Sequence, residues 1–439
     1  MRRFLTALVL GTALSVFTGQ VWAQEGGSPP SPFQLTPGAM ATMSDHHGGQ
    51  SSFLKWVSGV EASGFINVGY AYNFQDSERS SNSVTPPAAN PTGAETPFRV
   101  FDTFHNEFTV HQAILHLRKD ANEDNLVGFE LTPMLGKDTS LTQEANISFA
   151  GGTDVDILAA NIQVYTPSDV PLLAGTTFTL GKFVRRAGAE VIESPYNDNV
   201  SRSLMSSFMI PYTHTGIFAD RTIWAGDDDR EILGAGFGVV NGWGQHNVGN
   251  AVGNGNFPTY LTSTRVSPCE GFTTTVNYLF GETIGSDMYR NLLDVVMSFK
   301  LLEDTTLLLN ADWRGDEGAS LKGVGPTSGF ASSYAFAGVV RQDFEMIGSE
   351  SKDSYLAVRG EFYDDEHGAT LLGVVPTTSG TGALTELEIW SVTATLGWQP
   401  LASLLLRSEV RYDMANHKVY ESGDSANQVT LGFDATYLF

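Results

Sequence analysis

Charged residues of both signs lie close together in one segment of the chain, between residues 181 and 203. They include Lys182, Arg185, Arg186, Glu190, Glu193 and Arg202. Opposed fixed charges at a narrow point orient polar solutes and bias the flow of ions. This segment therefore predicts a charged constriction if it folds into an aqueous lumen, and a solvated surface loop if it folds outward.

A second set of charges recurs at every other position of apolar segments. In Leu404–Asp413 apolar residues alternate with charged ones, so one face of an extended strand is apolar and the other is charged. Four charges on a single strand face are costly in lipid and belong in water. The same reasoning assigns the following residues to the lumen of a barrel: Arg314, Arg359, Glu361, Arg407, Glu409, Arg411 and Asp434.

Enzymatic chemistry is the alternative use of polar groups in such a chain. Ser201, Ser203, His105 and His214 could supply a nucleophile and a base. The chain has no Gly-x-Ser-x-Gly elbow and no His-Glu-x-x-His pattern, so we predict that the protein is not an enzyme. His46-His47 stands in a segment without other metal-ligand spacing, and neither a metal site nor a cofactor is expected.

The elements that position these charges are short strands. Alternating segments separated by turn signals recur from Gly64 onward. They are Gly64–Asn73, Phe108–Arg118, Leu126–Met134, Ile157–Tyr165, Thr177–Phe183, Ile210–Ile223, Ile232–Val240, Tyr260–Val266, Phe272–Phe280, Leu292–Leu301, Thr306–Arg314, Tyr334–Val340, Tyr355–Tyr363, Ile389–Trp398, Leu404–Tyr412 and Val429–Phe439. These are about sixteen strands, an even number as single-chain bacterial barrels require.

The connections alternate in length along the chain. Short ones include Asn122-Glu123-Asp124, Asp227-Asp228-Asp229, Pro268-Cys269-Glu270, Leu302-Glu303-Asp304 and Gln399-Pro400, whereas residues 74–107 and 184–209 form long ones. Short periplasmic turns and long external loops are typical of outer-membrane barrels. The sequence therefore predicts an all-β fold, a transmembrane antiparallel up-and-down β-barrel, with both termini in the periplasm and an inward loop at about residues 184–209.

The two ends of the chain indicate the route to that membrane. Residues 1–23 have a basic start, an apolar stretch and small residues before a cleavage point, which is typical of a secretory signal peptide. Residues 24–61 are rich in Gly, Ser and Pro and are expected to form a periplasmic linker, so that the barrel comprises residues 62–439. Tyr437 and the final Phe439 look like the signal that delivers Gram-negative outer-membrane barrels to their assembly machinery.

The composition of the chain limits the classes of partner that it can bind. The formal net charge of −24 excludes nonspecific binding of nucleic acid through a basic surface. Acidic outer loops could bridge to lipopolysaccharide through divalent cations, or could simply be solvated. The chain has one cysteine, Cys269, so it cannot form an internal disulfide. Its mean hydropathy of −0.09 is compatible with a barrel because lipid-facing and lumen-facing residues alternate.

Several short motifs resemble the OmpL-like beta-barrel porin family. They occur in the order Phe101-Asp102-Thr103-Phe104-His105-Asn106, Gly181-Lys182-Phe183, Glu190-Val191-Ile192-Glu193, Ser201-Arg202-Ser203-Leu204, Pro211-Tyr212-Thr213-His214-Thr215-Gly216 and Val240-Asn241-Gly242-Trp243. The sequence departs from that family's pattern at Arg185-Arg186, where a small residue and a proline are expected. The resemblance implies a general diffusion porin in the Gram-negative outer membrane.

Two functions follow from these observations. One is a porin that lets small hydrophilic solutes or ions diffuse passively, with barrels that can associate as homotrimers. The other is a closed barrel that acts as a structural or surface-interaction protein of the outer membrane. The two differ in whether the charged rows line the lumen or fill it.

Overall fold

The computed structural model describes residues 59–75, 98–102, 106–142, 154–227, 230–243, 258–282, 289–317, 330–345, 353–366, 370–371, 386–420 and 424–439. The chain divides into two units, Met1–Leu35 and Thr36–Phe439, and every described residue belongs to the second. The predicted signal peptide, residues 24–58 of the predicted linker, and His46, His47 and His105 lie outside the described residues.

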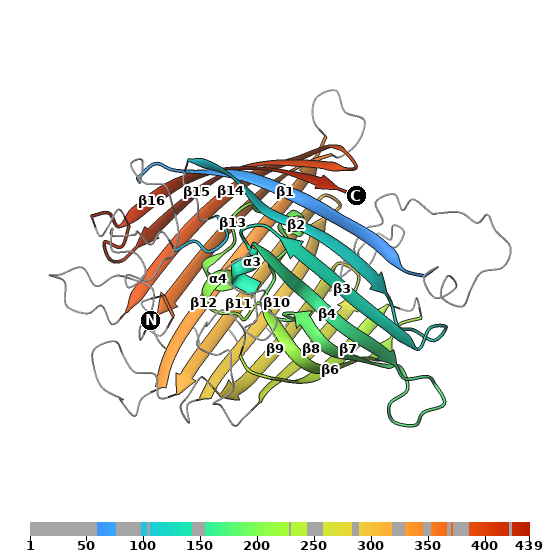
Figure 1. Cartoon of the computed structure of the whole chain (residues 1–439). Coiled ribbons are helices and arrows are strands. Elements are labelled where there is room, and N and C mark those ends of the chain that lie inside the picture. The colour runs from blue at the N-terminus through green and yellow to red at the C-terminus, as the bar shows by residue number, and fades with distance from the viewer. Residues whose placement is uncertain are drawn as a thin grey trace. The chain divides into compact units, whose positions relative to one another are not determined.

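The described chain forms one closed antiparallel barrel, in which each strand pairs with its neighbours in sequence and β1 pairs with β16 (Figure 1). The strands are β1 Glu61–Asn73, β2 Glu107–Lys119, β3 Val127–Leu135, β4 Val155–Tyr165, β5 Thr176–Val184, β6 Thr213–Ala225, β7 Glu231–Val240, β8 Thr259–Cys269, β9 Phe272–Glu282, β10 Tyr289–Leu302, β11 Thr305–Glu317, β12 Phe330–Phe344, β13 Ser354–Asp365, β14 Leu387–Leu401, β15 Leu404–Ala415 and β16 Asn427–Leu438. The predicted fold class and strand number are confirmed.

Alternation along the strands explains why they close in this way. In β14 buried and exposed residues alternate almost without interruption. Trp390 and Val392 are exposed on the outer face, whereas Thr393 and Thr395 are fully buried inside. The apolar face of each strand is stable against lipid, whereas the polar face is not. The polar face therefore turns to the interior, and this sets the orientation of each strand.

The barrel is sealed where its first and last strands meet. The backbone N–H of Phe439 donates to the carbonyl of Gly64 at 3.0 Å, and the N–H of Gly64 donates to the carbonyl of Phe439 at 2.8 Å. A Cβ on Gly64 would lie 2.3 Å from the carbonyl oxygen of Ile114 on β2 and 2.8 Å from the Phe439 ring, so a glycine is needed where β1 lies between its two neighbours.

Some predicted boundaries differ from the structure. β6 begins at Thr213, and Ile210, which was expected to start this strand, packs with other apolar residues inside the barrel. Cys269 ends β8, so the turn that follows consists of residues 270–271. Gln399 and Pro400 belong to β14, and the turn comes after them.

Among the residues that the structure describes, helical structure is limited to short segments of the connections. These are α3 Thr139–Thr142, the 3₁₀ turn η2 Ser194–Tyr196 and α4 Leu204–Phe208. No helix in the described ranges is both long and apolar enough to cross a membrane.

Candidate functional site

The connection between β5 and β6, residues 185–212, folds into the barrel, and we call it the inner loop. Its contacts reach far around the wall. The Tyr355 hydroxyl of β13 donates to the carbonyl of Asp198 at 3.0 Å, and Ala189 N–H donates to Asn310 of β11 at 2.8 Å. The inner loop therefore crosses the lumen instead of extending outward.

Carboxylates of the wall bind backbone N–H groups of the inner loop. Glu409 of β15 accepts hydrogen bonds from the N–H groups of Val200, at 2.7 Å, and Ser201, at 3.1 Å. Glu361 of β13 accepts one from Leu204 at 2.7 Å. Hydrogen bonds to an ionised acceptor are stronger than those between neutral groups. These carboxylates thus fix the second half of the inner loop to the wall.

Arginines of the wall bind carbonyl groups of the same half. Arg359 Nη1 lies 2.7 Å from the Ser201 carbonyl and 2.6 Å from Glu190 Oε1. Arg411 Nη1 donates to the Arg202 carbonyl at 2.7 Å, and its Nη2 lies 2.8 Å from Glu361. Cations and anions that alternate on neighbouring strands therefore bind complementary groups of one backbone segment.

Arg407 of β15 binds both a neighbouring strand and the inner loop. Its Nε donates to Asp434 Oδ1 at 2.9 Å, and its Nη1 donates to the carbonyls of Ser194, at 3.1 Å, and Asn197, at 2.6 Å. Asn67 of β1 also donates to Asp434, at 3.0 Å. One arginine thus joins β15, β16 and the inner loop.

Glu190 is the inner-loop carboxylate in this network. Its second oxygen accepts hydrogen bonds from the Ser203 N–H at 2.8 Å and the Ser203 hydroxyl at 2.6 Å. Burial by itself raises the pKa of Glu190, but Arg359 and the Ser203 hydrogen bonds outweigh that effect and hold the pKa below its ordinary value. Glu190 therefore stays ionised as the partner of Arg359.

Two arginines of the inner loop stabilise the conformation of the loop itself. Arg185 donates to the carbonyls of Ser206, at 3.0 Å, and Glu190, at 2.9 Å. Arg202 donates to the Ile192 carbonyl at 2.8 Å. Since both guanidinium groups are used by loop carbonyls, they hold the turns of the inner loop together.

Arg186 points to the opposite part of the wall. Its guanidinium carbon lies 4.7 Å from the ring centroid of Phe218 on β6. That ring lies against Gly236 and Gly238 of β7, where an added Cβ would come within 2.4 Å and 2.7 Å of its atoms. The alternate glycines of β7 therefore make room for Phe218, and Phe218 supports Arg186 through a cation–π contact.

The remaining expected residues pair with other groups inside the barrel. Lys182 lies 3.1 Å from Asp156, and Arg314 Nη1 donates to the carbonyl of Phe208 in α4 at 2.9 Å. Glu193 lies 3.2 Å from His116 Nε2 of β2. The inner loop thus contacts β2 as well as β11 to β16.

Burial corrects one expectation about the charged rows. They were expected to face water, but ten of them are at most 7% exposed because the inner loop and its neighbours cover them: Lys182, Arg185, Arg202, Arg314, Arg359, Glu361, Arg407, Glu409, Arg411 and Asp434. Of the expected set, Arg186, Glu190 and Glu193 are partly exposed.

The structure adds a charged cluster that the sequence reasoning missed. Arg265 of β8 lies 2.7 Å from Asp220 of β6 and 2.8 Å from Glu231 of β7. The three side chains are 22–29% exposed, so they keep contact with water. The sequence does contain one indication of this cluster. Asp220 lies between the outward-facing Ile217 and Ile223 in an alternating segment, and this position predicts an inward-facing charge.

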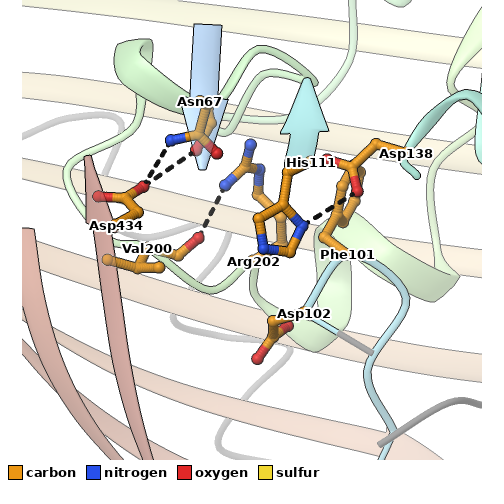
Figure 2. Close-up of a pocket in the computed structure, with 9 residues that line it drawn as sticks. Asn67, Phe101, Asp102, His111, Asp138, Val200, Arg202 and Asp434 are labelled. Atoms are coloured by element: carbon orange, nitrogen blue, oxygen red, sulfur yellow. Dashed lines mark hydrogen bonds and ion pairs between the residues drawn. The ribbon is translucent and has the colours of Figure 1, made fainter. Parts of the chain in front are cut away.

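A small polar cavity lies where the inner loop meets β1, β2 and β16 (Figure 2). Its volume is about 20 Å³, enough for one water molecule. Figure 2 shows Asn67 pointing at Asp434, and Arg202 pointing at the carbonyl of Val200. Such a small volume indicates that this side of the inner loop is packed closely against the wall.

The predicted assembly residues lie at the C-terminal end of β16 and directly after it, on the outside of the barrel. Tyr437 and Phe439 are about half exposed, and their ring centroids lie 6.3 Å apart. Both rings are therefore accessible at the end of the barrel where the short turns lie.

Comparisons with solved structures show the same fold at low sequence identity. OprB of Pseudomonas putida matches with a TM-score of 0.54 and 10% identity, covering 88% of this chain and 96% of that one. OmpF of Salmonella typhi, solved in complex with daunomycin, matches with a TM-score of 0.53 and 10% identity, covering 87% and 97%. An anion-selective porin from Comamonas acidovorans matches with a TM-score of 0.50 and 10% identity, covering 87% and 99%.

No curated protein matches the chain by sequence. A protein-family model does match, over residues 59–439, and its description is "Putative beta-barrel porin-2, OmpL-like". The matched residues include all sixteen strands and the inner loop. The chain therefore belongs to this OmpL-like family of beta-barrel porins, and it is a porin-like barrel of the outer membrane.

Proposed function

We propose that the protein is a porin through which small hydrophilic solutes or ions diffuse passively. The passage runs between the first half of the inner loop, residues 186–193, and the wall formed by β3 to β8. In this proposal the inner loop is the constriction of the pore, and Arg186 and Glu193 are the residues of the expected set that solutes meet there.

One observation carries this proposal, namely the difference in water contact between the two sides of the inner loop. The wall charges of β13 to β16 that hold the loop are at most 6% exposed. Asp220, Glu231 and Arg265 on the other side keep 22–29% of their surface exposed while they pair with one another. Charged side chains that stay hydrated inside a barrel are what a path for polar solutes requires.

The serines and histidine that could have formed a catalytic site are used otherwise. The Ser203 hydroxyl donates to Glu190 at 2.6 Å, and Arg359 lies 3.2 Å from the Ser201 hydroxyl. Within the described ranges His214 hydrogen-bonds to neither serine, and its ring packs near Phe183. A base must reach its nucleophile to activate it, so this arrangement supports a channel that is not an enzyme.

Single-channel recording of refolded protein in a planar bilayer, under a salt gradient, tests the proposal. We expect discrete ohmic steps. Arg186→Gln should shift the reversal potential toward cation selectivity because it removes a positive charge beside the passage, whereas Lys137→Gln, at an exposed external position, should not. Steps whose reversal potential is the same in the wild type and in Arg186→Gln would place the passage elsewhere.

A closed barrel is the second candidate, and a specific observation favours it. Apolar residues of the inner loop, including Leu204, Met205 and Met209, are buried in one cluster with wall residues such as Leu261 and Leu292. A packed apolar cluster inside the lumen excludes water. Folded protein that inserts into the bilayer without passing current would support this candidate, with the long loops as its functional part.

The surroundings of the barrel complete the proposal. We propose that a cleaved signal peptide at residues 1–23 directs export and that residues 24–61 form a periplasmic linker. Tyr437 and Phe439 deliver the barrel to the assembly machinery. The inserted barrel contacts lipopolysaccharide and associates as a homotrimer. Sequencing the N-terminus of the mature protein and cross-linking it in outer membranes test the first and the last of these.

A further inference from the structure

The motif that ends in Trp243 brings an aromatic ring to two arginines of the wall. Trp243 follows the end of β7 and is 5% exposed. The guanidinium carbon of Arg290 on β10 lies 5.0 Å from the ring centroid, and that of Arg314 on β11 lies 5.9 Å from it. An aromatic ring attracts cations at such distances, so Trp243 helps to hold two like charges close together.

The two arginines share a single carboxylate. Asp316 of β11 stands opposite Arg290 in the strand pairing and accepts a hydrogen bond from Arg290 Nε. Asp316 Oδ2 also lies 3.0 Å from Arg314 Nη2. Among the described residues no second carboxylate forms an ion pair with either arginine, and Asp365 on β13 accepts from the Ser333 hydroxyl instead, at 3.0 Å. The group of Arg290, Arg314 and Asp316 therefore carries one positive charge in excess.

Arg290 keeps donors that no protein group uses. Arg314 also donates to the carbonyl of Phe208 in α4, at 2.9 Å. Within the described part of the chain, by contrast, Arg290 donates only through Nε, to Asp316. Its side chain is 11% exposed, so the N–H groups on Nη1 and Nη2 are within reach of a ligand.

A buried hydroxyl without a partner lies beside Arg290. Thr259 of β8 is 0% exposed, and its Oγ1 makes no hydrogen bond with any residue that the structure describes. This hydroxyl lies over Gly281 of β9, where an added Cβ would collide with it, and Gly281 stands opposite Arg290 in the strand pairing. A buried polar group without a partner costs free energy. The hydroxyl and the guanidinium, on either side of a glycine, thus offer donors to the same space.

We propose that Arg290 and Thr259, beside Trp243, bind a small oxyanion, namely the carboxylate or phosphate group of a solute. A guanidinium presents two parallel N–H groups that match the oxygens of such a ligand, and the hydroxyl donates a further hydrogen bond. One negative charge on the ligand balances the excess charge of Arg290, Arg314 and Asp316. Chloride fits less well because a single spherical ion does not match the two N–H directions of the fork.

The position of the site suits capture of solutes. β8 and β10 begin, and β9 and β11 end, on the side of the barrel that carries the long connections. A solute that enters from this side meets the site next to α4 of the inner loop, to which Arg314 is bonded. The inference names a class of solute for the proposed pore and rests on the proposed function in that respect, whereas binding itself does not require that solutes pass.

The stability of the full-length mature barrel in different anions tests the site. Protein refolded in lipid vesicles is unfolded with urea at constant ionic strength, while chloride is replaced stepwise by acetate or by phosphate. A ligand that binds only the folded protein raises the unfolding midpoint. General salt effects act on all variants alike, so the difference between variants reports the site.

Arg290→Gln is the variant of the site, and Arg221→Gln is its matched control. Arg221 donates to the carbonyl of Leu172 toward the other end of the barrel, so its variant makes the same charge change away from the site. We expect acetate, phosphate or both to raise the midpoint of the wild type and of Arg221→Gln more than that of Arg290→Gln. The anion with the larger difference identifies the ligand as a carboxylate or a phosphate. Equal rises in the wild type and in Arg290→Gln would overturn the proposal.

A second variant keeps the test decisive if Arg290→Gln folds poorly. Thr259→Val removes the hydroxyl and keeps the shape of the side chain. It should bind the preferred anion about tenfold more weakly, because a hydrogen bond to a charged ligand is lost. An undiminished rise of the midpoint in Thr259→Val would contradict the site.

Failure of this site and failure of the pore are distinguishable. A wild type that shows the anion-dependent rise but passes no current would refute the pore and support the site. A wild type that conducts but shows no such rise would support the pore and refute the site.

Discussion

On its β13 to β16 side the inner loop is held by buried ion pairs and charged hydrogen bonds, whereas on the β6 to β8 side the wall charges pair with one another. Arg359, Arg407 and Glu409 all bind groups of the loop. Arg265 instead binds Asp220 and Glu231, and the trio stays partly hydrated. The same residue types therefore anchor a loop on one side of the lumen and form a partly exposed cluster of their own on the other.

The largest expected effect comes from Arg407→Met. This change leaves Asp434 buried without its counterion and frees the carbonyls of the inner loop, so we expect a loss of about 3–5 kcal/mol in the free energy of unfolding. Urea unfolding in lipid vesicles, followed by tryptophan fluorescence, measures it. Arg265→Met is the matched change on the hydrated side and should cost about 1 kcal/mol or less. Similar losses in both variants would erase the difference between the two sides.

A smaller effect is expected from Gly236→Ala. The new methyl group would lie 2.4 Å from the Phe218 ring and would displace the support of Arg186. Overpacking of this kind costs about 1–3 kcal/mol. Gly360→Ala is the control, because an added Cβ there meets no atom within 4 Å. Replacing Phe218 by Leu should relieve the cost in the double variant, and a cost that persists would show that the ring is not its cause.

The smallest effect is expected from Ser203→Ala. The Ser203 hydroxyl caps α4 by accepting from Ser206 N–H at 3.1 Å, and it also donates to Glu190. Loss of such a cap costs about 1 kcal/mol. The same unfolding measurement should show less change for Ser267→Ala, near the hydrated end of β8. An equal change in both would mean that Ser203 does not help to fix the loop.

Much of the fold could be predicted from the sequence because a strand between lipid and lumen needs a residue of different polarity at every second position. Val410 and Tyr412 on one face, with Arg411 and Asp413 on the other, fix both the strand and its orientation. The start of β6 was misplaced since Ile210 and Tyr212 are apolar for a different reason: they pack inside the barrel.

The state of the charges could not be predicted in the same way. Alternation shows that Arg359 and Arg407 point inward, but it does not show that the inner loop covers these side chains and binds them. The neighbourhood of Asn277, Asp294 and Asp312 could not be predicted either, because only the pairing of β9, β10 and β11 brings these residues side by side. Contacts between residues far apart in sequence decide both features.

The seam between β1 and β16 has a consequence for the order of events in folding. Asn67 and Asp434, which hydrogen-bond across it, are 367 positions apart in the chain. Closing so long a span has an entropic cost that local contacts do not repay, so the ring can form only after the other strands have brought its ends together. Until then β1 presents an unpaired edge that can recruit a second chain. A chain shortened before β16 should therefore accumulate as aggregates or on chaperones, never as a shorter ring.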